Sequence, residues 1–177
     1  MGNPRDKISM ESMKVFLEVE RQIRSLRAAL NSWVYGVGVT SLMRTGDMTY
    51  AEQVTKEAFK IWIRNVLKWA SDKNTPMEVI RDYINHLDKM LIMRQDDFEL
   101  NEEGEKIQVR VRKCIFRDSC QWREAEGAPT FCPRAVSLAA AIEVGCREPG
   151  PCFRKKYIVA SVSRKEKECT AEIAPQT

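Results

Sequence analysis

Six cysteines are the residues in this chain whose type and spacing point to a specific chemistry. All six lie at or after residue 114, at positions 114, 120, 132, 146, 152 and 169. Thiolates are nucleophiles and ligands for soft metal ions, so this clustering indicates a metal site, an iron–sulfur cluster or a reactive thiol. In a secreted chain, the same even count would indicate a set of disulfides.

The first three cysteines are placed favourably for metal binding. Cys114 follows an expected strand, Cys120 falls in an expected loop, and Cys132 precedes a proline at an expected helix start. Loop cysteines can converge on a tetrahedral zinc ion. A helix N-terminus also lowers the pKa of a thiol, which favours the thiolate at Cys132.

We expect Cys169, on the last predicted strand, to be the fourth zinc ligand, with Cys146 or Cys152 as substitutes if a loop folds back. A cysteine followed by proline also closes many iron–sulfur motifs, so an iron–sulfur cluster is the main alternative to zinc. Disulfides, redox thiols and inert buried cysteines are the remaining interpretations.

The single histidine, His86, offers little support for hydrolytic chemistry. It falls in the middle of an expected helix in the cysteine-free half, where a helix-surface or core-edge position is typical. We therefore assign no catalytic residue and favour a protein that is not an enzyme. A cluster-dependent redox protein, or a hydrolase with a cysteine nucleophile, is the enzymatic alternative.

The elements that must position the cysteines begin with a helical front. Apolar residues recur at helical spacing from Met10 to Leu30, and Gly36 and Gly38 then allow either a close approach of another backbone or a helix break. The form Ser/Thr-x-x-Glu predicts that a second helix starts at a capping box at 49–52 and ends near 71–74.

A second capping box at 75–78, with Pro76 at the first helical position, predicts a third helix through Leu91. From residue 97 the period changes to two and predicts strands at 98–100 and 107–111, joined by a turn at 101–104. A small-residue helix at 135–144 and strands at 157–162 and 169–173 follow. The fold class is α+β: a helical N-terminal layer packed on an antiparallel sheet of about four strands, with one further helix.

Three aromatic residues, Phe59, Trp62 and Trp69, sit at helical spacing in the second predicted helix. Such residues form either the core or the wall of an apolar ligand cavity, because they are large and offer few polar groups. We name these three as candidate ligand-binding residues.

Length and composition limit the organisation of the chain. With 177 residues it has room for one domain, which we divide into a flexible start at 1–9 and one α+β domain at 10–174. This domain has a helical part at 10–91 and a cysteine-bearing sheet part at 97–174.

The net charge of +4 is spread evenly along the chain and predicts no nucleic-acid partner. No apolar run is long enough to span a membrane and no signal segment is present, so we expect a cytoplasmic protein. Aromatic residues on the first helices favour a homodimer.

The overall pattern resembles the small-molecule-binding domain family named after bacteriochlorophyll 4-vinyl reductase, whose archaeal members are described as predicted hydrocarbon-binding proteins. The similarity spans residues 30–174 and rests on the glycines at 36 and 38, the segments 97–100 and 107–111, the cysteines at 114, 120 and 132, and the closing segment 167–173. It implies a fold similar to the TRAPP vesicle-tethering subunits, a dimer formed through helices, and a lipid-like or aromatic ligand.

The resemblance also implies a structural zinc held by Cys114, Cys120, Cys132 and Cys169. We therefore expect a binding or sensor module for an apolar, hydrocarbon-like small molecule, with zinc fixing its cysteine-bearing half.

Overall fold

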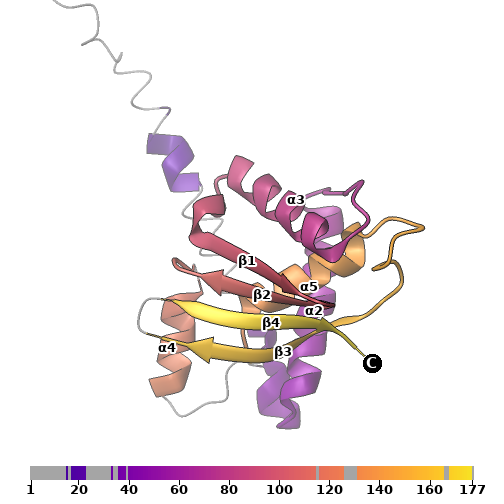
Figure 1. Cartoon of the computed structure of the whole chain (residues 1–177). Helices are drawn as coiled ribbons and strands as arrows, with labels where there is room; N and C mark the ends of the chain where they lie inside the picture. Colours follow the sequence, from indigo (N-terminus) through magenta and orange to yellow (C-terminus); the bar gives the residue numbers. More distant parts are fainter. Residues whose placement is uncertain are drawn as a thin grey trace, which may run out of the picture.

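The computed structural model describes residues 15, 17–22, 33, 36–38, 40–114, 116–125, 131–165 and 168–176. Within them, N-terminal helices pack on a four-stranded antiparallel sheet, with further helices between the second and third strands (Figure 1). This confirms the α+β fold class expected from the change of hydrophobic period along the sequence.

The sheet consists of two hairpins that meet at its centre. Its strands are β1 (Phe98–Glu103), β2 (Lys106–Val111), β3 (Tyr157–Arg164) and β4 (Cys169–Pro175). They lie in the order β1-β2-β4-β3, and every neighbouring pair is antiparallel. Alternate residues of β2, namely Ile107, Val109 and Val111, are buried, so one face of the sheet contributes to the core.

Helix α5 (Pro133–Gly145) is the centre of the molecule. It contacts β3 and β4 as well as α2 (Met48–Asn65) and α3 (Pro76–Lys89), and Figure 1 shows it behind the sheet. Every residue from Pro133 to Ile142 is buried. The small side chains of its alanine run permit close packing on several sides.

The predicted start and end of α2 are both wrong. The N-cap is Asp47, whose carboxylate accepts a hydrogen bond from Tyr50 N at 3.1 Å, instead of Thr49 of the expected capping box. A carboxylate at this position also complements the positive end of the helix dipole, which a hydroxyl cannot do. The helix ends at Asn65, and Lys68 then adopts a left-handed conformation (φ 48°) that prevents its continuation to 71–74.

The start of α3 is confirmed. Thr75 and Glu78 form the reciprocal capping box, and Pro76 occupies the first turn. The helix ends at Lys89, two residues before the expected Leu91, which has a positive φ of 57°. The four strands and α5 fall where the sequence places them, with ends that extend by a few residues.

Helix α4 (Arg117–Ala125) occupies a segment that the sequence analysis treats as a loop. It lies beside the ends of β3 and β4 in Figure 1. Most of the helix expected at 10–30 lies outside the described residues, although 17–22 are helical. No helix within the described part of the chain is both long and apolar enough to cross a membrane.

Candidate functional site

The four cysteines named from the sequence lie at one end of the sheet, on four separate elements. Cys114 follows β2, Cys120 is on α4, Cys132 is the N-cap of α5, and Cys169 begins β4. In the sheet register, Cys169 lies between Val111 of β2 and Arg164 of β3. The end of each strand and the start of each helix therefore determine where these thiols meet.

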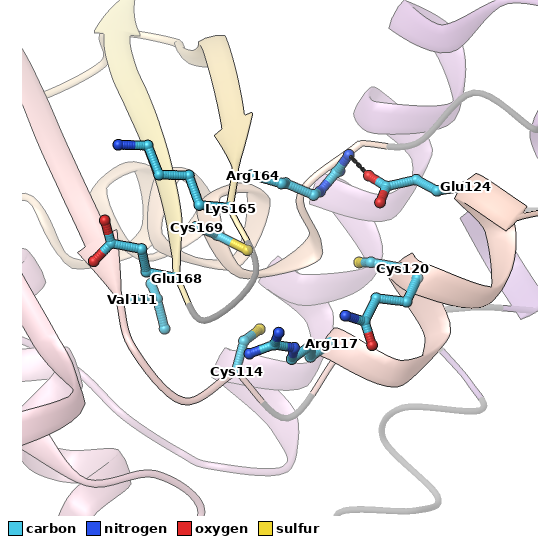
Figure 2. A pocket seen from close by; sticks show the side chains of 10 residues that line it. Val111, Cys114, Arg117, Cys120, Glu124, Arg164, Lys165, Glu168 and Cys169 are labelled. Atoms are coloured by element: carbon cyan, nitrogen blue, oxygen red, sulfur yellow. Dashed lines mark hydrogen bonds and ion pairs between the residues drawn. The ribbon is translucent and has the colours of Figure 1, made fainter.

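Three of these cysteines line one pocket of about 230 Å³. Figure 2 shows the sulfur atoms of Cys114, Cys120 and Cys169 directed into this space. The fourth, Cys132, is buried, and its thiol interacts electrostatically with the other three. The structure thus brings together the cysteines at 114, 120, 132 and 169, which are widely separated in sequence.

Cationic side chains surround the cysteine pocket. Arg117, Arg164 and Lys165 line it, together with Glu124 and Glu168. Arg164 donates to Glu124 at 2.6 Å and to the Phe131 carbonyl at 3.1 Å, which connects β3 to α4 and to the segment before α5. Within the described residues, Arg117 has no carboxylate partner, and its charge acts on the thiol of Cys169.

Burial is the largest influence on the thiols. It raises the pKa of Cys120 to about 11 and that of Cys132 to about 12. Burial also raises the pKa of Cys169, against the attraction of Arg164 and Arg117. The expectation that the start of α5 favours the thiolate at Cys132 is therefore wrong, since desolvation of a fully buried sulfur outweighs the helix terminus. Thiols with raised pKa values are weak nucleophiles at neutral pH.

The four thiols are not arranged as a metal coordination shell in this structure. Within the described part of the chain, no three His, Cys, Asp or Glu side chains are placed so that they can hold a metal ion. The donor types fit zinc, since three thiols line the pocket and the buried thiol of Cys132 lies near them. The zinc site consequently stays a prediction.

Cys146 and Cys152 belong to a different part of the molecule. They form a disulfide with each other, with their Cα atoms 5.8 Å apart, and both sulfur atoms contact the carbonyl oxygen of Asn74. The other four cysteines carry free thiols. Because both sulfurs of this pair are already bonded, neither Cys146 nor Cys152 substitutes as a fourth ligand.

The three candidate ligand-binding aromatics are packed in the core. Phe59 and Trp62 lie edge to face with their ring centres 6.4 Å apart, and only 1% and 9% of their surfaces are exposed. Trp69 follows α2 instead of continuing it, stacks near Tyr83, and donates from Nε1 to Asp82 at 3.2 Å. None of the three lines a pocket described in this section, so their role toward a ligand also stays a prediction.

A second hollow lies at the opposite end of β3. Its deep part, about 120 Å³, is formed between α2, α5 and the start of β3, and it shares Gln53, Lys56 and Gln176 with an open groove of about 610 Å³ along α2. The sequence does not predict this site because its residues come from distant segments. The only available signal was apolar residues at Val54, Ala58 and Ile61 on α2, beside those that face the core.

Comparisons of the chain with protein-family models, with curated proteins and with solved structures gave no match. The resemblance to the 4-vinyl reductase family, the homodimer and the cytoplasmic location stay predictions.

Proposed function

We propose that this chain is a non-enzymatic binding module for an apolar small molecule, with a zinc tetrathiolate formed by Cys114, Cys120, Cys132 and Cys169 as its structural centre. The observation that carries the proposal is the gathering of these four cysteines at one end of the sheet. The resemblance to 4-vinyl reductase domains agrees with it.

The charges around the thiols support a metal–thiolate centre. Zinc with four thiolates carries two net negative charges, which are costly to bury without nearby cations. Arg117 and Lys165 line the pocket without carboxylate partners among the described residues, whereas Arg164 is paired with Glu124 at 2.6 Å (Figure 2). The charges of Arg117 and Lys165 would offset part of a metal–thiolate charge, which four neutral thiols do not carry.

The proposed role of the metal is to fasten α4 and the start of α5 to the paired ends of β2 and β4. Its ligands come from the end of β2, from α4, from the start of α5 and from the start of β4. Metal binding would draw these thiols closer together and contribute directly to the free energy of folding. The raised thiol pKa values argue against nucleophilic catalysis by Cys120 and Cys132.

Metal analysis by plasma mass spectrometry tests the zinc site. We expect about one zinc per chain in anaerobically purified wild-type protein, because a closed tetrathiolate holds a single ion. A Cys114→Ser, Cys132→Ser double variant should lose the metal. The matched control is Cys146→Ser, Cys152→Ser, which also removes two sulfurs but should retain the zinc.

Substitution of cobalt(II) for zinc provides a readout that does not depend on variants folding well. Wild-type protein should show strong thiolate-to-cobalt charge transfer, as tetrahedral thiolate coordination requires. Iron with a broad visible absorption would favour the iron–sulfur alternative instead. Protein that takes up neither zinc, cobalt nor iron would refute a metal centre.

A further inference from the structure

The hollow between α2 and β3 has a more enclosed end, which contains a carboxylate and an ammonium group among apolar side chains, and an open apolar wall. The enclosed end contains Thr49, Glu52 and Lys56, above a floor that includes Val136 and Ala139 of α5. The open part runs along α2 past Tyr50, Val54, Ala58 and Ile61. Tyr50 and Ile61 are 47% and 59% exposed, so this wall is accessible from solvent.

Most charges near this hollow are already paired with one another. Glu143 binds Lys56 at 2.8 Å and Lys60 at 2.5 Å, and Lys156 lies 3.7 Å away. Lys56 also donates to the carbonyl of Tyr157 at 2.6 Å. The ammonium of Lys56 is thus directed into the protein and is committed to two acceptors there.

Glu52 is the exception. Its side chain lines the enclosed end of the hollow, and none of the described residues forms a hydrogen bond to its carboxylate. Burial raises the pKa of Glu52, although the charge of Lys56 acts in the opposite direction. A half-buried carboxylate without a donor is destabilised, and an ammonium ion placed against it would remove this cost.

We infer that the hollow between α2 and β3 binds a primary amine with an apolar chain, with the ammonium group on Glu52 and the chain along Val54, Ala58 and Ile61. This inference deepens the proposed function and rests on its ligand-binding part, because it specifies where the apolar molecule lies and which head group it carries. A carboxylate head group would meet Glu52 with like charge, and an alcohol would form a weaker, uncharged hydrogen bond.

Isothermal titration calorimetry at pH 7 with decylamine, decanol and decanoate tests the inference on the zinc-loaded protein. Wild-type protein should bind decylamine at least about tenfold more tightly than decanol, since a charge-assisted hydrogen bond is worth about 1.4 kcal/mol or more over a neutral one. Decanoate should bind most weakly. Glu52→Gln should abolish the preference for the amine.

Two variants separate the head-group contact from the chain contact. Glu57→Gln is the matched control, since Glu57 lines the same groove but already accepts from Lys60 at 2.6 Å; it should keep the preference. Ile61→Ser should weaken decylamine and decanol alike, because it removes apolar surface without adding a charge, and its exposed position makes unfolding an unimportant complication.

The outcomes distinguish this inference from the proposed function. Equal binding of decylamine and decanol would overturn the amine assignment while leaving an apolar ligand in place. Binding of none of the three would overturn the site itself, whereas the metal content of the same samples decides the zinc proposal. If light scattering shows a dimer that Ile61→Ser converts to a monomer, the groove is an interface between two copies and the inference is wrong.

Discussion

At the scale of single residues, the most costly arrangement is the buried charge cluster around Glu143. Its side chain is only 4% exposed and contacts two lysines that are nearly as buried. It also accepts a hydrogen bond from Tyr157 N at 2.8 Å, which fixes the start of β3 against α5. Lys60 also pairs with Glu57, whereas Lys56 has no second carboxylate partner among the described residues.

Replacing Glu143 by Gln should reduce the free energy of unfolding by about 3–5 kcal/mol, because buried ammonium groups lose their counter-ion. Burial raises the pKa of Glu143, but hydrogen bonds from Lys56 and Lys60 outweigh burial and hold it below its ordinary value of 4.5. The ionised carboxylate therefore stabilises the fold above pH 4.5, and this contribution is lost as the pH falls through the lower folded-state pKa. Urea unfolding of the wild type and of Glu143→Gln at several pH values measures this contribution. A difference in their free energies of unfolding that stays the same in acid would contradict the prediction.

Gly38 and Gly36 differ in the space that surrounds them. A Cβ atom at Gly38 would collide with the ring of Phe131, whose Cε1 would be 2.6 Å away, whereas one at Gly36 meets nothing within 4 Å. Gly38→Ala should therefore destabilise the protein by about 1–3 kcal/mol through overpacking. Gly36→Ala should stabilise it by about 0.5–1 kcal/mol, since alanine favours a helix. Chemical denaturation measures both changes. If the two substitutions changed the free energy of unfolding in the same direction, the close approach of Phe131 to Gly38 would be refuted.

At the scale of elements, the start of α2 shows how one residue sets a boundary. The sequence predicts a cap at Thr49, whereas the structure uses the Asp47 carboxylate. Glu52 lies just after the first turn of this helix and lines the hollow beside β3. The stability of this helix start therefore bears on the carboxylate that the amine inference requires.

Removing the cap should have a measurable effect on stability. Asp47→Ala should cost about 0.5–2 kcal/mol, because Tyr50 N loses its acceptor and the helix dipole loses a nearby negative charge. Thr49→Ala should change the stability little, since it lies inside the first turn. Thermal unfolding monitored by circular dichroism compares the stability of the two variants. A larger loss of stability for Thr49→Ala would show that Thr49 is the N-cap, as the sequence predicts.

At the scale of the whole molecule, two sulfur-based features lie in different regions. The free cysteines gather at the end of the sheet where β2 and β3 finish, while the disulfide joins the end of α5 to the loop before β3. The disulfide closes only a short loop, so it acts on the local connection between α5 and β3. In the proposed zinc site, the four free thiols would instead connect β2, α4, α5 and β4.

Thiol counting tests this division. Unreduced protein, denatured in Ellman's reagent, should show four reactive thiols, and reduction should raise the count to six. Cys146→Ser, Cys152→Ser should lower the free energy of unfolding by roughly 2 kcal/mol, the loop-closure entropy expected for so short a loop. Six reactive thiols before reduction would show that the pair is not bonded.

The sequence by itself determined the elements and the composition of the candidate site. Helical and strand periods reflect which face of each element is buried, so the α+β class, all four strands and α5 could be predicted. The same reasoning selected Cys114, Cys120, Cys132 and Cys169, because cysteines at element ends can converge. It failed for α4, whose polar residues lack an apolar period, and for the cap of α2, because the capping-box pattern at 49–52 pointed to Thr49 instead of Asp47.

Only the tertiary structure decided which side chains meet and in what surroundings. The disulfide between Cys146 and Cys152, the pairing of Arg164 with Glu124, and the isolation of Glu52 depend on contacts between distant segments. Arg134 shows the same dependence: it is 1% exposed and lies 5.3 Å from the ring centres of both Phe98 and Phe116. Local periodicity records whether a residue is buried, but burial energies and charge pairing depend on the identity of neighbours that only the folded chain brings together.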